Sequence, residues 1–331
     1  MFNNKSILIT GGTGSFGNAF VNYLIKNYKP KKLIIFSRDE FKQFQMAEKF
    51  PTEKYRFLRY FIGDVRDKQR LKLATKDVDF LIHAAALKQV ASAEYNPQEY
   101  INTNILGAQN VIDVCMENKV KKVIALSTDK AANPINLYGA TKLASDKLFI
   151  AANNLVGKEK TRFAIVRYGN VLNSRGSVVP YFKSLSENKS KFFPITHPKM
   201  TRFWITLEET VKFVDFTFKI MSGGEIFVPK IPSIKIIDLA KAINPNMKIK
   251  IIGIKPGEKL HEIMCPRDSS HLTLEFNKYF LIKPDVVFFS INNSFQKNYL
   301  KEKGKKVKDN FEYNSLTNKQ YLSINQIKKI I

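Results

Sequence analysis

The stretch SILITGGTGSFG, residues 6–17, decides the fold of this 331-residue chain. It begins with residues that suit a buried strand, and Gly11, Gly14 and Gly17 follow at regular spacing. Phe20 and Leu24 then lie on one face of a predicted helix. Glycines let a backbone approach a pyrophosphate, and a helix N-terminus stabilises its negative charge. The stretch therefore predicts a strand, a turn and a helix that together bind a dinucleotide.

The alternation of predicted strands and helices continues beyond residue 24. Further strands are predicted from apolar runs at residues 31–36, 55–62, 80–84, 123–127 and 164–168. Helical patterns lie between them, as at residues 97–118 and 137–154. Strands that alternate with helices indicate an α/β fold whose parallel sheet is covered on both faces. We therefore predict a doubly wound Rossmann sheet.

The rhythm breaks after about Tyr168, where glycine, proline and serine become frequent. We predict that residues 1–170 form the dinucleotide-binding Rossmann domain and that residues 171–331 form a smaller α+β substrate-binding domain. The segment 201–235 contains a predicted helix and is expected to return to the Rossmann domain. The lysine-rich stretch from about Lys301 is interpreted as a peripheral extension.

The composition is that of an ordinary globular protein, with 44% hydrophobic and 25% charged residues. No apolar run reaches the ~18–20 residues of a membrane span, and the N-terminus lacks a signal-peptide pattern. Cys115 and Cys265 have no short-spaced partner, so neither a disulfide framework nor a metal site is expected. We expect a soluble, cytoplasmic protein with no membrane contact.

The formal net charge is +25. Nucleic-acid binding is one interpretation, but the lysines are spread along the chain and form no arginine-rich or aromatic-interleaved block. We therefore expect no nucleic-acid partner. The positive field would still attract an anionic substrate.

The choice of cofactor is indicated at the end of the second predicted strand. Ser37 and Arg38 occupy the position where NAD-binding proteins usually carry an acid, and Lys42 follows one turn later. Because arginine there accommodates a 2′-phosphate, we predict NADP. Asp39 leaves NAD as an alternative, since the sequence does not tell which side chain points inward.

Other cofactor contacts are predicted from position. Asp64 and Val65 follow the third strand and are expected near adenine, whereas Ala84 and Ala85 leave room for the nicotinamide ribose. The glycine turn itself contributes Gly11, Thr13, Gly14, Ser15, Phe16 and Gly17.

Five residues form the predicted catalytic cluster: Thr128, Asp129, Lys130, Tyr138 and Lys142. Tyr138 and Lys142 are four apart, so on a helix they share one face, and the lysine can lower the pKa of the phenol. Asp129 and Lys130 add a second acid and a second base, which suggests that oxidation is one step of a longer reaction. Thr128 either orients the substrate or bonds the local backbone.

The chain resembles the extended short-chain dehydrogenase/reductases and, among them, the soluble inverting UDP-N-acetylglucosamine 4,6-dehydratases. Related membrane-anchored enzymes carry methionine at the position of Tyr138. The resemblance covers residues 7–275 and rests on these stretches: ILITGGTGSFG, SRDE, FIGDVRD, IHAAALK, AEYNP, ALSTDKAANPINLYGATKLASDKLF, RYGNV, SRGSVVP, MTRFWITLEE, GGEIFVPKIPS and KPGEKLHE.

The resemblance implies a reaction and a substrate. Tyr138 would take the C4 hydroxyl proton of UDP-N-acetylglucosamine, a neutral Lys130 would take the C5 proton, and Asp129 would protonate the departing C6 hydroxyl. The product, inverted at C5, would enter pseudaminic acid biosynthesis. The resemblance also implies a homo-oligomer. It places these residues around the substrate, with Arg202 as a further basic candidate: Lys88, Asn170, Arg175, Thr196, Lys255 and Glu258.

The sequence departs from the family pattern at Gln89, Ala91, Asn173 and Lys255. These positions are expected to line the substrate pocket, so they leave the sugar specificity open. A nucleotide-sugar 4-epimerase or ketoreductase of the same fold is the alternative enzyme, and it would not need Asp129 and Lys130. A non-catalytic NADP-binding protein is the alternative outside enzymes.

Overall fold

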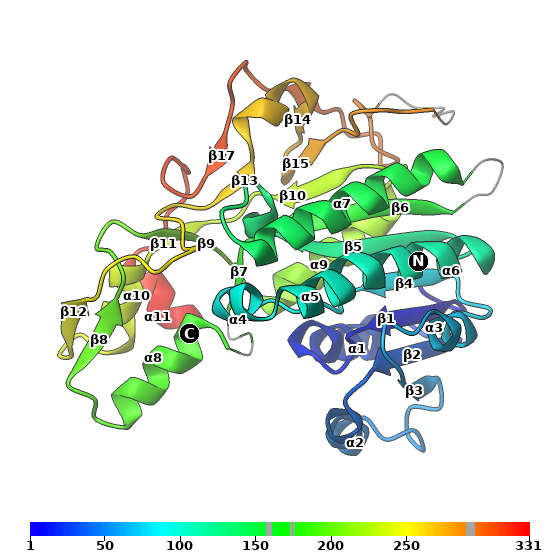
Figure 1. Cartoon of the computed structure of the whole chain (residues 1–331), viewed down its shortest axis with the longest axis horizontal. Helices are drawn as coiled ribbons and strands as arrows, with labels where there is room; N and C mark the ends of the chain where they lie inside the picture. The colour runs from blue at the N-terminus through cyan, green and yellow to red at the C-terminus, as the bar shows by residue number, and fades with distance from the viewer. Residues whose placement is uncertain (157–160, 173, 175, 289–294) are drawn as a thin grey trace.

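The computed structural model of the chain describes residues 1–156, 161–172, 174, 176–288 and 295–331. Among these residues the largest sheet has ten strands (Figure 1). Seven of them are parallel and lie in the order β3 (Leu58–Ile62), β2 (Lys32–Ser37), β1 (Ser6–Thr10), β4 (Phe80–His83), β5 (Lys122–Thr128), β6 (Arg162–Tyr168) and β10 (Ile226–Pro229). The order reverses between β1 and β4, as in dinucleotide-binding sheets. The predicted doubly wound fold is confirmed.

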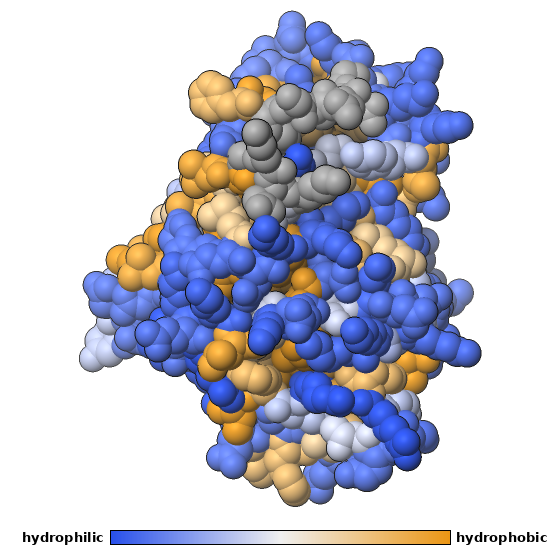
Figure 2. Space-filling model, turned by 90° about the vertical axis from the view of Figure 1, so that its right-hand side faces the viewer, coloured by the Kyte–Doolittle hydropathy of each residue, from blue (hydrophilic) through white to orange (hydrophobic). Residues whose placement is uncertain are grey.

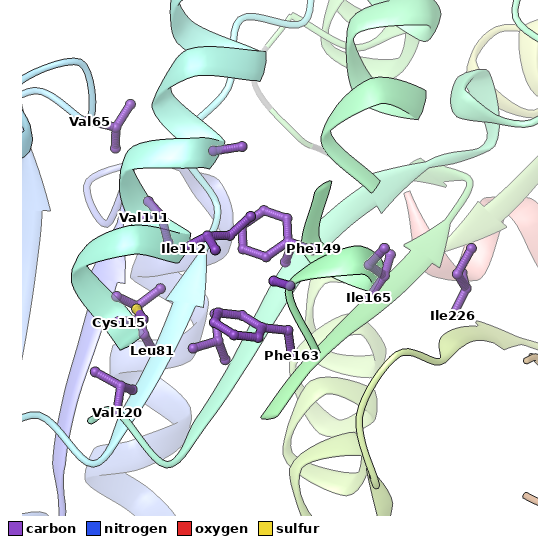
Figure 3. Packing of buried hydrophobic residues seen from close by; sticks show 14 of the residues in the cluster. Val65, Leu81, Val111, Ile112, Cys115, Val120, Phe149, Phe163, Ile165 and Ile226 are labelled. Atoms are coloured by element: carbon purple, nitrogen blue, oxygen red, sulfur yellow. The ribbon is translucent and has the colours of Figure 1, made fainter. Parts of the chain in front are cut away.

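Helices cover both faces of this sheet. One face packs against α3 (Lys68–Ala74), α6 (Gly107–Glu117) and α7 (Leu137–Leu155). The other packs against α1 (Ser15–Asn27), α2 (Glu40–Lys49) and α9 (Leu207–Ile220). Successive side chains of β1 point to opposite faces of the sheet: Leu8 packs in the apolar cluster on the first face and Ile7 in the cluster on the second. Figure 3 shows Ile112 of α6 and Phe149 of α7 packed over the first face.

The helix predicted at residues 97–118 has an irregular middle. It consists of α5 (Pro97–Tyr100), a π-helical turn η1 (Ile101–Leu106) and α6. Asn104 lies in that turn, and its side chain accepts a hydrogen bond from the Leu87 N–H and donates one to the Leu87 carbonyl, both at 2.9 Å. The loop after β4 is held to the helix in this way.

A second group of elements lies to one side of the large sheet (Figure 1). It surrounds a separate apolar cluster that includes Phe182, Phe193, Trp204 and Ile327. Its strands form two small sheets: β7 (Asn170–Val171), β9 (Thr201–Ile205) and β11 (Ser233–Lys235), and β8 (Phe192–Ile195) with β12 (Lys248–Ile251). Its helices are α8 (Val178–Glu187), α10 (Ile236–Ile243) and α11 (Ile324–Ile330).

The chain crosses between the two parts more than once. Helix α9 packs against α1, β5 and β6, and β10 pairs with β6. The large sheet also receives antiparallel strands from the region expected to bind substrate, namely β15 (Tyr279–Ile282), β14 (Thr273–Glu275) and β16 (Lys305–Lys306). Sequence alone gave no sign of this extension, since short amphipathic strands have weak patterns.

The interpretation of the C-terminal stretch as peripheral is wrong. Strand β17 (Tyr313–Asn314) pairs with β13 (Ile263–Cys265), and the side chain of Ile327 is fully buried. The Tyr313 hydroxyl donates to the Ile231 carbonyl and accepts from the Ile231 N–H, both at 2.9 Å. A lysine-rich segment can be firmly attached through a few apolar and hydroxyl groups.

Hydrophilic residues cover most of the face seen in Figure 2, and hydrophobic residues form small separate patches on it. Within the described ranges, none of the helices combines the length and the apolar character that crossing a membrane requires.

Candidate active site

A cavity of about 960 Å³ lies between the large sheet and the smaller group of elements. Its wall combines the glycine turn after β1, the ends of β2, β4 and β5, and the loops near β7, β8 and β12. The carboxyl ends of parallel strands at a switch in strand order are the usual place for a ligand.

The glycine turn fits a dinucleotide diphosphate. Gly11 has φ +64°, and a Cβ atom there would lie 2.9 Å from the backbone of Ala85. Helix α1 begins after Gly14, and no side chain of the described residues caps it. Its first N–H groups can therefore donate to an anion. A Cβ on Gly17 would lie 1.9 Å from the Gly12 carbonyl oxygen, which makes Gly17 a packing residue and not a lining one.

The remaining cofactor candidates all line the cavity: Gly11, Thr13, Gly14, Ser15, Phe16, Ser37, Arg38, Asp39, Lys42, Asp64, Val65, Ala84 and Ala85. The Asp39 carboxylate caps α2 by accepting from the Lys42 N–H at 2.9 Å, and it also pairs with the Lys42 ammonium. The Arg38 guanidinium lies 3.7 Å from Asp64 and is half exposed. Asp39 is therefore engaged in helix capping, and both Asp39 and Arg38 line the cavity.

Helix α7 positions Tyr138 and Lys142. Its start is fixed by Asn136, whose side-chain oxygen accepts from the Gly139 N–H at 2.7 Å. Both side chains are buried and line the cavity. Burial raises the pKa of Tyr138 to about 12, although the charge of Lys130 and a hydrogen bond with Thr128 oppose this. Lys130 is therefore the cation that acts on the phenol here, where the sequence had suggested Lys142.

Burial has the opposite effect on the amine of Lys142. It lowers the pKa of Lys142, although the negative charge of Asp146 opposes the shift. The Asp146 carboxylate is itself buried and accepts hydrogen bonds from Ser127 at 2.7 Å and from Arg167 at 3.1 Å.

Lys130 lies between two carboxylates. Its Nζ atom is 3.0 Å from Asp129 Oδ1 and 3.4 Å from Glu262 Oε1. Burial alone would lower the pKa of Lys130, but the charges of Asp129 and Glu262 outweigh it and raise that pKa above its ordinary value. The protein's own groups thus favour a charged Lys130, whereas the resemblance implies a neutral Lys130 when it acts at C5.

Asp129 and Thr128 take different places in the site. Thr128 lines the cavity and donates to Asp129 Oδ1 at 2.9 Å. Asp129 is 1% exposed and is absent from the described residues that line the cavity. Its carboxyl thus lies one layer behind Thr128 and Lys130.

Sequence reasoning missed Glu262 as a site residue. Glu262 lines the cavity, is 2% exposed, and its Oε1 atom is 3.7 Å from Arg202 Nε. It belongs to the stretch KPGEKLHE, whose earlier members Lys255 and Glu258 were assigned to the substrate. Its place in this stretch could have marked Glu262 as a candidate site residue, but the stretch does not indicate that Glu262 contacts Lys130.

Most of the substrate candidates line the same cavity. Those that line it are Lys88, Asn170, Thr196, Arg202, Lys255 and Glu258. Arg202 is directed toward Glu262, and the Thr196 hydroxyl donates to the Met200 sulfur at 3.1 Å. Arg175 and Asn173 lie outside the described residues. Gln89 and Ala91 also line the cavity.

Comparison with protein families gives one match, to the family described as polysaccharide biosynthesis protein, over residues 7–284. A Campylobacter jejuni protein named UDP-N-acetylglucosamine 4,6-dehydratase (inverting) is 62% identical over 331 residues, covering 100% of this chain and 98% of the relative. A Rickettsia bellii protein named UDP-glucose 4-epimerase is 45% identical over 293 residues, covering 86% of this chain and 84% of the relative.

Solved structures agree on the fold. The X-ray structure of Pen from Bacillus thuringiensis has a TM-score of 0.88 and 36% identity, covering 100% of this chain and 98% of its own. The dTDP-glucose 4,6-dehydratase DesIV from Streptomyces venezuelae, determined with NAD and TYD bound, has a TM-score of 0.69 and 19% identity, covering 77% of this chain and 86% of its own.

Proposed function

The chain belongs to the polysaccharide biosynthesis protein family of extended short-chain dehydrogenase/reductases, and we propose that it is a UDP-N-acetylglucosamine 4,6-dehydratase that inverts C5. One observation carries the proposal: Thr128, Lys130, Tyr138 and Lys142 line a single cavity that also contains the glycine turn, and Asp129 is bonded to two of them. A full-length relative with that name at 62% identity supports the same reaction.

In this proposal, side chains of the protein carry out the proton transfers. The glycine turn after β1 would hold a nicotinamide dinucleotide, which would supply hydride transfer to and from the sugar. Tyr138 takes the proton of the C4 hydroxyl, and the positive charge of Lys130 favours the ionised phenol. Lys142, beside Tyr138 on α7, would bind the nicotinamide ribose. Thr128 orients the oxygen at C4. The resulting ketone acidifies the C5–H bond, which prepares the elimination.

Lys130 must lose its proton before it acts at C5. Asp129 is the nearest acceptor, along the 3.0 Å hydrogen bond between them. A proton moved along that bond leaves a neutral amine and a protonated carboxyl. The amine then takes the C5 proton. The Asp129 proton reaches the departing C6 hydroxyl through the Thr128 hydroxyl, which hydrogen-bonds Asp129 and lines the cavity, so that water leaves and the ion pair is restored. A solvent proton finally adds to the opposite face of C5, which inverts that centre.

The preferred cofactor in this proposal is NADP. Asp39 is occupied as the cap of α2, and the Arg38 and Lys42 side chains line the cavity beside Ser37. Two cations at this place favour a 2′-phosphate. We further propose that the enzyme works in the cytoplasm as a homo-oligomer and that its product enters pseudaminic acid biosynthesis.

A nucleotide-sugar 4-epimerase is the second candidate, because relatives with the name UDP-glucose 4-epimerase share 45% identity. An epimerase returns hydride to C4 and loses no water. The buried Asp129–Lys130 pair favours the dehydratase, since epimerisation needs no base at C5.

NMR of the product tests the proposal. Purified protein is incubated in D₂O with UDP-N-acetylglucosamine and either NADP or NAD. We expect a 6-deoxy-4-keto sugar nucleotide with inverted C5 and deuterium at that carbon, formed faster with NADP. A product that keeps its C6 oxygen would overturn the dehydratase assignment.

A further inference from the structure

The cavity contains a second buried carboxylate that the mechanism above does not use. Glu262 Oε1 lies 3.4 Å from Lys130 Nζ and 3.7 Å from Arg202 Nε. Its other oxygen, Oε2, is buried and has no hydrogen-bond partner in the part of the chain that the structure describes. A carboxylate 2% exposed keeps its charge only beside cations, and these two cations are the ones in contact.

The backbone of Glu262 is fixed by the C-terminal segment. Its N–H donates to Ser315 Oγ at 2.9 Å, and its carbonyl accepts from the Ser315 N–H at 2.8 Å. Ser315 Oγ also bonds the Thr201 hydroxyl at 2.7 Å. Glu262 is therefore held by two chain segments, β9 and the residues after β17, that lie far from Lys130 in sequence.

The surroundings of Lys130 are charged on several sides. Asp129 and Glu262 attract its ammonium, and Arg202 and Lys259 repel it, while Tyr138 faces it across the cavity wall. The Lys259 ammonium donates to the Ala132 carbonyl at 2.6 Å, and the charge of Glu262 also acts on it. Glu262 is thus the one acid from a distant segment among the described groups that face Lys130.

We propose that Glu262 is a positioning residue for the C5 step: it aims the Lys130 amine into the cavity and sets the pH range over which the Lys130–Asp129 pair holds the single proton that the elimination needs. The inference rests on the function proposed above. Asp129 alone, as its immediate neighbour in sequence, would leave the long Lys130 side chain free to swing toward solvent. The second contact, with Glu262, fixes the direction of the Lys130 side chain.

The charge and the position of Glu262 can be separated by two variants. Glu262→Gln keeps the shape and one acceptor but removes the charge. Ser315→Ala keeps the charge but removes the hydroxyl that accepts from the Glu262 N–H, one of the two hydrogen bonds between these segments. Glu225→Gln is the matched control, because Glu225 is also a buried acid, with N–H donors from Ser222 and Gly223 at 2.6 Å, and does not line the cavity.

The experiment measures the rate of deuterium uptake at C5 and kcat across pH, with NADP affinity and thermal stability measured alongside. For Glu262→Gln we expect the rise of kcat with pH to move about one unit or more toward acid, since a negative charge beside Lys130 is lost. Its plateau should fall roughly 10-fold as the amine loses its direction. NADP affinity should change by less than about 2-fold.

For Ser315→Ala we expect a similar fall in the plateau with no movement of the pH profile. Glu225→Gln should leave both unchanged. An unmoved profile in Glu262→Gln, an equal shift in Glu225→Gln, or a matching loss of NADP affinity would each overturn the inference. If wild-type protein makes no dehydrated product, the proposed function itself fails, which is a separate outcome.

Discussion

Lys130 shows how much one side chain depends on neighbours that sequence does not reveal. Its presence beside Asp129 indicated acid–base chemistry, and the structure places both groups 3.0 Å apart. Its charge state depends on three effects of the fold: burial lowers the Lys130 pKa, and the charges of Asp129 and, from a segment distant in sequence, Glu262 raise it. The sequence therefore indicated acid–base chemistry at this position but did not predict whether Lys130 is charged.

Replacing Lys130 tests its role directly. Lys130→Ala should remove deuterium uptake at C5 and lower product formation by about 100-fold or more, the usual contribution of a general base. NADP binding, measured by fluorescence titration, should persist, since the glycine turn is untouched. A folded variant that no longer binds NADP would instead place Lys130 in the cofactor site.

Tyr138 and Lys142 were easier to predict. Their spacing alone puts them on one helical face, and both line the cavity from α7. The groups that lower the pKa of Tyr138 were not predicted from this helix, because Lys130 and Thr128 lie at the end of β5.

At the scale of elements, α9 is the helix that ties the later part of the chain to the Rossmann sheet. It begins with a capping box, in which the Thr206 side chain accepts from the Glu209 N–H and the Glu209 carboxylate accepts from the Thr206 N–H. Val211, Val214 and Phe218 then pack into the apolar layer beneath the sheet. The return of this segment therefore depends on a helix with a well-defined start.

Thr206→Ala should destabilise the fold by about 1 kcal/mol, the usual value of an N-cap hydroxyl. Urea unfolding measures the loss. Thr52→Ala is the control, because Thr52 is exposed and makes only a 3.4 Å contact with its neighbour Glu53. Equal stability of the two variants would contradict the role of the cap.

At the scale of the whole molecule, one buried histidine links stability to pH. His83 ends β4, is 1% exposed, and shares a 2.9 Å hydrogen bond with Thr10 of β1. Burial, with a smaller effect of the Lys142 charge, lowers the pKa of His83 from 6.5 to about 3. The folded protein therefore keeps this imidazole neutral where the unfolded chain would protonate it.

Stability should fall as the pH drops below 6.5, because only the unfolded state then binds the proton. The loss from His83 should reach about 2 kcal/mol at pH 5, at 1.36 kcal/mol per pH unit. Urea unfolding at pH 7 and pH 5 measures it, with His83→Gln as the comparison because that variant cannot take up the proton. The same pH dependence in both proteins would contradict this account.

The sequence by itself determined the Rossmann half of the molecule. Local spacing and apolar periodicity predict its strands, the glycine turn and the Tyr138–Lys142 pair, and both patterns can be recognised in short stretches of the sequence. The same local logic found the cofactor candidates that line the cavity, since they follow the ends of predicted strands, whereas most substrate candidates came from the family resemblance.

Only the tertiary structure decided what surrounds those residues. It joined β14, β15 and β16 to the large sheet, attached the C-terminal segment through Ser315, and brought Glu262 against Lys130. Contacts between distant segments depend on how whole layers pack, and no short-range pattern encodes them. Because electrostatic energies in a buried site are set by such contacts, the charge state of Lys130 is a property of the folded molecule.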